Sequence, residues 1–396
     1  MTIPRRRLKI AYVVHECDRR GGHNRYVAEL ADRLSPHHSV HLFACRWRDI
    51  ALDRITTHRI PAIHWTDSLR ILSYLATISL YLRPRDFDII HSQGVCTPWF
   101  NVMTAHVCHA ARLQASYSFQ KDHPLRSIHY WLSLKLAALF QTSWECSRRS
   151  GGPTRIIACS AKTREEMISL CGADPASMRL VYPGVDSERF HPRNRAAFRG
   201  ALLREAGWSE GARVVLFVGA IGKGLGTAIE ALAELSGEPP PVLLAIGKLP
   251  ERDYATQIVA RGLQGRVRFA TPAGDIQRYF AAADVFVFPS LYDSFGFVVL
   301  EAMASGVPVI CSRAAGAHEV MAPGENGFVL DDPRDSRALA KLVGQTLEDD
   351  RLWRRLAAGA RETAQQYTWD RTAAETLRVY EELVDEKERR GRRRLT

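Results

Sequence analysis

The sequence predicts an α/β protein built from two Rossmann-like domains, each with a parallel sheet. Short, wholly apolar runs alternate with helical segments along the chain, which is typical of strands buried on both faces between helices. Glycine-containing loops follow several of these runs, as they do where a parallel sheet meets its ligand. A length of 396 residues is typical of two domains rather than one.

The first half of the chain alternates between expected strands and expected helices. The expected strands are residues 8–14, 40–44, 89–91, a strand end within 101–109, and 155–159. The expected helices are residues 26–34, 69–82, 125–140 and one that follows Ser160. Ser160 is the first candidate for the N-cap of that last helix, and Thr163 with Glu166 forms an alternative capping box. Gly21-Gly22 separates the first strand from the first helix. Such a turn could bring backbone N–H groups close to a phosphate. A simple tight turn is an equally good interpretation.

The segments 69–82 and 125–140 are both apolar, contain aromatic residues and are flanked by arginines. Core or inter-helix packing is the favoured interpretation of each. An in-plane contact with a membrane surface is the alternative, because basic ends with interfacial aromatic residues are also typical of such helices. Neither segment is long enough to span a bilayer.

The second half of the chain repeats the alternation. The expected strands are residues 214–219, 242–247, 267–271, 285–288 and 307–310, and the expected helices are 226–235, 276–283 and 297–305. Gly306 is placed as the C′ residue of the helix 297–305. Residues 180–192 contain the Pro and Gly residues of a hinge between the domains. A last helix follows residue 369 and has on one side Ala373, Leu377, Tyr380, Leu383 and Val384.

The stretch from Pro289 to Ser312 carries the strongest functional pattern. It is a strand end, a polar loop with Asp293, a helix beginning at Phe297, and the next strand. The backbone N–H groups of Phe297 and Val298 would form an anion site, which the helix dipole reinforces. Glu301 lies one turn further on, where its carboxylate could accept hydrogen bonds from a ribose diol. Two acids flanking an anion site suit a nucleotide-sugar, although an isolated pair of acids is more often a solvated surface feature.

The sequence Asp293-Ser-Phe-Gly-Phe-Val-Val-Leu-Glu301 resembles the acid-x7-Glu signature of retaining glycosyltransferases with the GT-B fold. These belong to the large family 4, group 1, which includes bacterial mannosyl- and glucosyltransferases; Asp before Ser-Phe-Gly is a frequent variant of its usual Glu. The resemblance implies that Glu301 holds the donor ribose and that Asp293 contacts the donor sugar. By the same resemblance, the donor-binding residues expected in this stretch are Ser294, Phe295, Gly296, Phe297, Val298 and Glu301.

The resemblance extends to three further places. Gly21-Gly22 matches a glycine pair that faces the donor phosphates. Thr104-Ala-His106 matches a pattern that places a histidine beside the reacting sugar, which implies that His106 hydrogen-bonds a sugar hydroxyl, with His109 as the second candidate. Gly247 ends an expected strand at the place where the family holds the nucleotide base.

The loop after residue 218 resembles the family's diphosphate clamp. Gly219 and Lys223-Gly224 match a pattern in which an arginine and a lysine grip the donor diphosphate. Ala220 stands where the arginine is expected, so only Lys223 matches the pattern. Either the donor diphosphate is bound more weakly or another basic residue takes the place of the arginine. A dinucleotide fingerprint and a P-loop are both rejected for this loop, because Thr227 and Gly224 stand where those motifs need other residues.

Composition excludes several classes of function. Asp86-Phe-Asp88 resembles a metal-binding D-x-D, but it runs directly into the strand 89–91. The resembled family has a similar Asp before this strand without a metal role, so the resemblance implies that no metal is bound here. The eight cysteines form no C-x-x-C pair, which favours reduced thiols in the cytosol. No cleavage site follows the basic N-terminus, so no secretory signal is expected.

The net charge of +11 is concentrated at the two ends of the chain. Nine of these charges lie within residues 5–9 and 389–394, which leaves the rest near +2. Contact of the basic termini with an anionic membrane surface and a merely solvated tail are equally consistent with this distribution. Nucleic acid is not expected as a partner, because no stripe of basic and aromatic residues accompanies the charge.

The predicted architecture is therefore GT-B, with two Rossmann-like domains facing an interdomain cleft. Residues 1–190 form the acceptor-side domain and 191–366 the donor domain, while 367–396 form a helix packing back on the first domain plus a basic tail. The expected protein is cytoplasmic, with peripheral contact to the inner face of the membrane as the open alternative.

The predicted function is retaining transfer of a hexose-type sugar from a nucleotide-diphosphate sugar to a hydroxyl of a glycan or lipid-linked acceptor, in the synthesis of cell-envelope polysaccharide or glycolipid. The catalytic candidates are His106, Lys223 and Asp293. No cofactor is expected besides the donor substrate. A non-catalytic nucleotide-sugar-binding partner subunit and, with less support, a GT-B sugar-nucleotide epimerase remain as alternatives.

Overall fold

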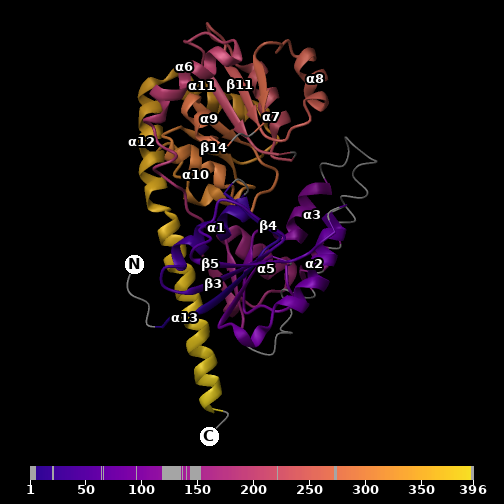
Figure 1. Ribbon diagram of the computed structural model, residues 1–396. Coiled ribbons are helices and arrows are strands. Elements are labelled where there is room, and N and C mark those ends of the chain that lie inside the picture. The colour runs from indigo at the N-terminus through magenta and orange to yellow at the C-terminus, as the bar shows by residue number, and fades with distance from the viewer. Residues whose placement is uncertain are drawn as a thin grey trace. The chain divides into compact units, whose positions relative to one another are not determined.

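The computed structural model of the protein contains two compact units, an N-terminal unit of Met1–Pro183 with Trp369–Thr396 and a C-terminal unit of Gly184–Thr368 (Figure 1). The structure describes all residues except 1–5, 20–21, 64, 66, 95, 118–134, 136, 140, 143–152, 221, 272–273 and 394–396. The first boundary lies before the expected residue 190, because Val185 donates its N–H to the carbonyl oxygen of Tyr367 (2.9 Å) and Arg361 bonds the carbonyl oxygens of Ser187 and Phe190. These contacts bind the hinge segment to the C-terminal unit.

The N-terminal unit is organised around a seven-stranded parallel sheet in the order β5-β3-β1-β6-β7-β8-β9. Its strands are β1 (Lys9–Val13), β3 (Ser39–Ala44), β5 (Ile55–Arg59), β6 (Ile89–Gln93), β7 (Val102–Ala105), β8 (Arg155–Ala158) and β9 (Met178–Leu180). A small second sheet pairs β2 (Glu16–Cys17) with β4 (Arg46–Trp47). The apolar runs identified in the sequence therefore form buried parallel strands, as predicted.

Helices cover both faces of this sheet. They are α1 (Gly22–Leu34), α2 (Asp67–Tyr81), α3 (His109–Tyr117), α5 (Ala161–Cys171) and, from the end of the chain, α13 (Trp369–Arg393). Helix α1 follows β1 and leads outward to β3, whereas α2 leads back from β5 to β6, so right-handed crossovers place the two helices on opposite faces. Helix α13 packs with α1, and Figure 1 shows it across the sheet from α2.

The first helix begins earlier than expected. The sequence placed a glycine turn before a helix at Tyr26, but α1 already includes Gly22, and Gly21 lies outside the described residues. The ion pair of Arg25 with Glu29 across one helical turn (3.4 Å) supports helical structure in this first turn. Most of the expected helix 125–140 also lies outside the described residues.

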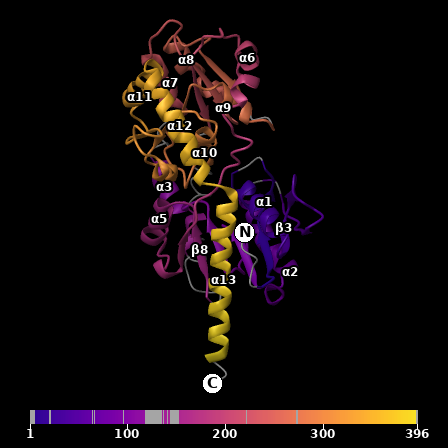
Figure 2. The same ribbon diagram turned by 90° about the vertical axis from the view of Figure 1, so that its left-hand side faces the viewer.

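Helix α13 is held on the N-terminal sheet by a buried chain of polar side chains. The Tyr380 hydroxyl lies 2.5 Å from Nδ1 of His91 and donates to the Tyr12 hydroxyl at 3.1 Å, while Nε2 of His91 meets the hydroxyl of Thr104 at 2.7 Å. Burial lowers the pKa of His91 to about 3, so the ring is neutral at physiological pH. The apolar side of the helix predicted from Ala373 to Val384 is buried. Figure 2 shows the first part of α13 beside the other elements of the N-terminal unit.

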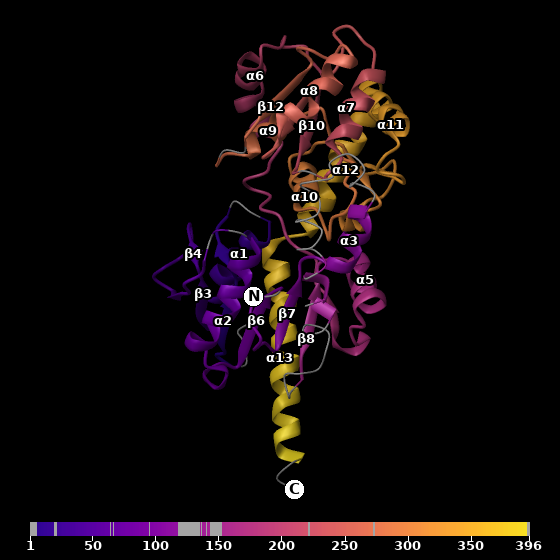
Figure 3. The ribbon, with the colours of Figure 1, turned by 90° about the vertical axis from the view of Figure 1, so that its right-hand side faces the viewer.

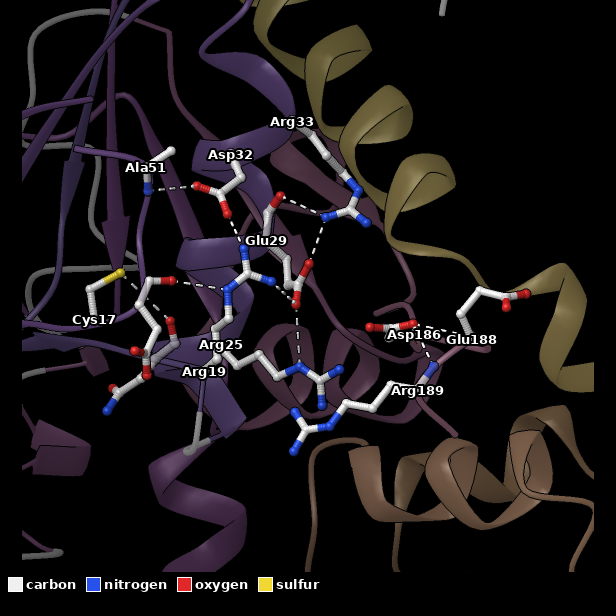
Figure 4. Close-up of polar contacts among 12 residues, drawn as sticks. Cys17, Arg19, Arg25, Glu29, Asp32, Arg33, Ala51, Asp186, Glu188 and Arg189 are labelled. Carbon is white, nitrogen blue, oxygen red and sulfur yellow. Dashed lines mark hydrogen bonds and ion pairs between the residues drawn. The ribbon is translucent and has the colours of Figure 1, made fainter. Parts of the chain in front are cut away.

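A cluster of three arginines and three acids joins α1 to its surroundings in the N-terminal unit. Figure 4 shows its members on α1 and Arg19 before that helix. Its centre is the buried carboxylate of Glu29, which accepts from Arg19 (3.2 Å), Arg25 (3.4 Å) and Arg33 (2.6 Å). Arg19 also pairs with Asp32, and Arg33 reaches Asp370 at the start of α13 (2.6 Å). The cluster thus connects the loop after β2, helix α1 and helix α13 through one buried acid.

Glu29→Ala is expected to destabilise the N-terminal unit by about 3–5 kcal/mol, because it removes the buried carboxylate that pairs with Arg19, Arg25 and Arg33. The free energy of unfolding, measured by chemical denaturation of the full chain, checks this. Asp370→Ala is the matched control: its carboxylate is largely exposed, so its loss is expected to cost under about 1 kcal/mol. Equal effects of the two substitutions would contradict the central role of Glu29.

The C-terminal unit contains a six-stranded parallel sheet in the order β12-β11-β10-β13-β14-β15 (Figure 3). The strands are β10 (Val214–Val218), β11 (Val242–Ile246), β12 (Val267–Ala270), β13 (Val285–Phe288), β14 (Val309–Ser312) and β15 (Phe328–Leu330). Helices α7 (Leu225–Glu234) and α11 (Ser336–Glu348) share a core with this sheet. The other helices are α6 (Asn194–Ala206), α8 (Glu251–Ala260), α9 (Gln277–Ala282), α10 (Phe297–Ala304) and α12 (Asp350–Gln366).

Two predicted helix ends are confirmed in detail. Ser160 caps α5, because its hydroxyl oxygen accepts the N–H of Thr163 at 3.0 Å. Gly306 ends α10 in the left-handed region (φ +68°) and donates to the carbonyl oxygen of Met303. The following strand begins at Val309 rather than at residue 307 as predicted, since the N–H of Val307 is bonded back to Ala302 of the helix.

Candidate functional site

In the C-terminal unit, three loops meet at the carboxyl ends of β10, β11 and β13. Gly219 donates its N–H to the carbonyl oxygen of Ile246 (2.9 Å) at the end of β11. Gly247 follows directly and donates to Ala270 on β12 (3.0 Å). Gly224 approaches the β13 loop so closely that a Cβ atom would overlap the carbonyl oxygen of Pro289. The glycines therefore bring the Lys223 loop against the loop that carries Asp293.

Lys223 and Asp293, two of the predicted site residues, are in direct contact. The ammonium group of Lys223 lies 2.6 Å from Oδ2 of Asp293 and donates to the carbonyl oxygen of Tyr292 at 2.8 Å. The other carboxylate oxygen of Asp293 accepts the N–H of Phe295 (3.1 Å). Each of the two charged side chains is about three-quarters buried. Within the pair the charges cancel, so an anionic ligand would have to share Lys223 with Asp293.

The first turn of α10 follows this ion pair. Gly296 precedes the helix in the left-handed region and offers no side-chain cap to Phe297 and Val298. Glu301 lies on the second turn, with the residue largely buried. Ser294 and Phe295 are also buried in the connecting loop. All predicted donor-site residues of this stretch therefore lie on one loop and the helix that it begins.

In the N-terminal unit, His106 follows β7 at the carboxyl end of the sheet. Its Nε2 lies 2.7 Å from the amide oxygen of Gln93 at the end of β6, and its Nδ1 lies 3.9 Å from the Cys159 thiol. The ring edge packs on Tyr26 with centroids 5.1 Å apart. Burial lowers the pKa of His106 well below its ordinary value, so the imidazole is neutral near pH 7. Both ring nitrogens thus face protein atoms. The sequence analysis expected His106 to hydrogen-bond a sugar hydroxyl and did not predict these protein partners.

His109 and Gly22 are each the first residue of a helix, α3 and α1 respectively. His109 is the first residue of α3, and its backbone N–H donates to the side-chain oxygen of Gln141 (2.7 Å). Burial lowers the pKa of its imidazole to about 4. Gly22 is exposed at the start of α1.

Two residues near His106 were missed by the sequence interpretation. Gln93 is buried and bonds the ring directly. His23 is exposed in the first turn of α1, and its ring centroid lies 5.8 Å from that of His106. His23 directly follows the glycine pair Gly21-Gly22, and this position could have marked it as a site residue. Nothing in the sequence around Gln93 marks that residue in the same way.

The D-x-D pattern has a structural role in the N-terminal unit. The carboxylate of Asp88 accepts the backbone N–H of Lys9 (2.9 Å) and pairs with Arg6 (3.3 Å). Within the described parts of the chain, no cluster of three or more His, Cys, Asp or Glu side chains could hold a metal ion. Among the same residues, no helix combines the length and the apolar character that crossing a membrane requires.

Comparison with known proteins decides the family. The family model described as Glycosyltransferase Family 4 matches residues 20–189, and the model described as Glycosyl transferases group 1 matches residues 199–363. A D-inositol 3-phosphate glycosyltransferase of Xylanimonas cellulosilytica is 33% identical over 301 residues, which cover 71% of this chain and 72% of that protein. The chain belongs to the family 4, group 1 glycosyltransferases.

Other similarities show how far the likeness of this glycosyltransferase extends. A D-inositol 3-phosphate glycosyltransferase of Jonesia denitrificans is 35% identical over 243 residues, and this match covers 57% of the chain but little more than half (56%) of that relative. WaaG, a glycosyltransferase involved in lipopolysaccharide biosynthesis, superposes with a TM-score of 0.76 at 22% identity, over 93% of this chain and 99% of WaaG. HepE of Anabaena, solved in complex with UDP-glucose, gives a TM-score of 0.68 at 20% identity, covering 93% and 99%. At this level of identity the solved structures establish the GT-B fold with its two Rossmann-like domains.

Proposed function

We propose that this glycosyltransferase transfers a hexose-type sugar, with retention of configuration, from a nucleotide-diphosphate sugar to a hydroxyl group of a glycan or lipid-linked acceptor. The observation that supports this most directly is the convergence of Lys223, Asp293 and the first turn of α10. A cation and a helix N-terminus suit a diphosphate, and a carboxylate beside them suits sugar hydroxyls. The UDP-glucose complex of the structurally similar HepE supports a uridine or related nucleotide-sugar as the donor.

The proposed chemistry rests on stabilising the leaving group. The bond between the anomeric carbon and the diphosphate oxygen breaks, and the acceptor oxygen forms the new bond on the same face while its proton passes to the departing diphosphate. Lys223 and the N–H groups at the start of α10 would balance the charge that develops on that diphosphate. Glu301 would hold the ribose. His106, kept neutral by burial, would shape the sugar-facing surface of the N-terminal unit.

The proposal includes a cellular role in the synthesis of envelope polysaccharide or glycolipid, on the cytoplasmic side of the membrane. WaaG acts in lipopolysaccharide biosynthesis, and the relatives named D-inositol 3-phosphate glycosyltransferases suggest a cyclitol phosphate as a second class of acceptor. Metal-independent turnover is part of the same proposal.

A screen of the purified chain against UDP- and GDP-sugars, with EDTA present, tests this function. One donor is expected to raise the melting temperature and to be hydrolysed slowly without acceptor. Turnover that requires added Mg²⁺ or Mn²⁺ would contradict metal independence alone. Stabilisation by a donor without any turnover, even with lipid extract, would favour a nucleotide-sugar-binding partner subunit. Two observations support this alternative: Lys223 is ion-paired with Asp293, and alanine stands at position 220.

A further inference from the structure

The three loops that meet at the candidate site in the C-terminal unit contain two basic residues and one acid. The loops are residues 219–224 after β10, 247–250 after β11 and 289–296 after β13, and their charged residues are Lys223, Lys248 and Asp293. Lys223 is ion-paired with Asp293 (2.6 Å), so its charge is already balanced within the protein. A donor diphosphate carries more than one negative charge, which this shared cation and a helix N-terminus balance only in part. Lys248 is the other cation that these loops offer to the diphosphate.

Lys248 lies one residue from a close contact between the β11 loop and the β10 loop. Gly247 makes this contact, because a Cβ atom on it would overlap the carbonyl oxygen of Gly219. Gly219 in turn packs on the side chain of Lys223, so that its own Cβ atom would lie 2.9 Å from the Cβ atom of Lys223. Consecutive Cα atoms are about 3.8 Å apart, and a lysine has a flexible stem of four carbons. The two lysines therefore belong to backbone segments that both contact Gly219.

The side chain of Lys248 is available to a ligand. It is exposed, and it forms no ion pair or hydrogen bond with any residue that the structure describes. The loop after β14 differs, because its cation Arg313 is paired with Asp331 (2.6 Å). Arg252, in the first turn of α8, is also exposed, but acids precede and follow it directly in the sequence. The chain thus lacks a cation at the exposed position 220 and has an accessible one on the adjoining loop.

We propose that Lys248 binds the diphosphate of the donor and replaces the arginine that is missing at position 220. Its ammonium group approaches the phosphates from the β11 loop, while Lys223 and the first turn of α10 approach them from the β10 and β13 loops. Lysine suits this place, because a compact cation on a flexible stem binds a phosphate as a point charge and needs no fixed side-chain geometry. The inference rests on the proposed function, since it takes a nucleotide-diphosphate sugar as the donor.

Isothermal titration calorimetry of the full chain with UDP and with GDP tests this role without any acceptor or turnover. Lys248→Ala is expected to weaken binding of the preferred nucleoside diphosphate by roughly tenfold or more, because one charge-assisted hydrogen bond is lost. The affinity for uridine or guanosine, obtained by displacing the bound diphosphate, is expected to stay unchanged, since a nucleoside has no phosphate. Arg252→Ala is the matched control, four residues along the chain and equally solvent-facing, and it is expected to bind like the wild type.

A second substitution separates phosphate binding from a structural role of Lys248. Ala220 is exposed, so an arginine there adds a cation without burying it. Ala220→Arg/Lys248→Ala is expected to recover most of the affinity lost in Lys248→Ala, which a merely structural defect at position 248 would not allow. Wild-type affinity in Lys248→Ala, or an equal loss for the free nucleoside, would overturn the inference while leaving the proposed function in place. Failure of the wild type to bind either diphosphate would overturn both.

Discussion

Replacing Lys223 with alanine is expected to lower kcat/KM for sugar transfer by about 10²–10³-fold, the range found when one electrostatic donor is removed from a site of developing negative charge. The melting temperature is expected to change little, because the side chain lies at the carboxyl end of the sheet and, among the described residues, bonds the neighbouring loop alone. Steady-state kinetics with the donor identified by the screen, together with thermal unfolding, provide the measurement. Turnover like that of the wild type would contradict the assigned site.

The decrease in kcat/KM expected of Lys223→Ala has two causes, because Lys223 contacts Asp293. Loss of Lys223 removes the cation that would face the diphosphate, and it also leaves the carboxylate of Asp293 without the partner that lies 2.6 Å away. An unpaired carboxylate in a partly buried site repels the diphosphate. The substitution is therefore expected to raise the KM for the donor as well as to lower kcat.

A double variant separates these two parts. In Lys223→Ala/Asp293→Asn the side-chain amide can still accept the N–H of Phe295, but the negative charge is gone. Donor binding, measured by thermal shift, is expected to recover partly relative to Lys223→Ala, while kcat stays low. If the double variant binds the donor no better than the single one, repulsion by Asp293 contributes nothing and the pair has only a structural role.

The sequence predicted most elements of the fold, because their signals are local. The apolar run Val285–Phe288 forms β13 with the predicted bounds, and Ser160 caps α5 as its hydroxyl and position indicated. Strand β14 was misplaced by two residues for a physical reason. Val307 is apolar, but its N–H closes the end of α10, and Pro308 has no N–H to offer a neighbouring strand.

The contacts of the candidate site could not be predicted in the same way. Lys223 and Asp293 are 70 residues apart, and their pairing depends on which strands become neighbours in the sheet. Gln93 and His106 meet for the same reason, since β6 and β7 lie side by side. Resemblance identified Lys223, Asp293 and His106 one residue at a time, but it did not indicate that the cation would be neutralised or that the imidazole would already have partners.

Glu301→Ala is the second substitution expected to have a large effect, through the ribose of the donor. A hydrogen bond to a charged group contributes about 1.5–3 kcal/mol, so losing two bonds to a diol corresponds to a decrease of roughly 10²–10⁴-fold in kcat/KM. The fold is expected to tolerate the change, because Glu301 lies within α10 and alanine favours a helix. Glu301→Gln preserves the volume and one oxygen acceptor, and an intermediate loss is expected from it.

Comparing a ribose donor with its 2′-deoxyribose form tests whether the decrease in kcat/KM of Glu301→Ala arises at the ribose. The wild type is expected to discriminate strongly between the ribose and 2′-deoxyribose forms of the same nucleotide-sugar, since the carboxylate loses one of its two partners with the second form. Glu301→Ala has no carboxylate to lose a partner, so its kcat/KM is expected to be nearly the same for both donors. The comparison is a double-mutant cycle in which one change is made on the ligand, and general damage to the active site cancels from it. Undiminished discrimination in Glu301→Ala would show that another residue holds the ribose.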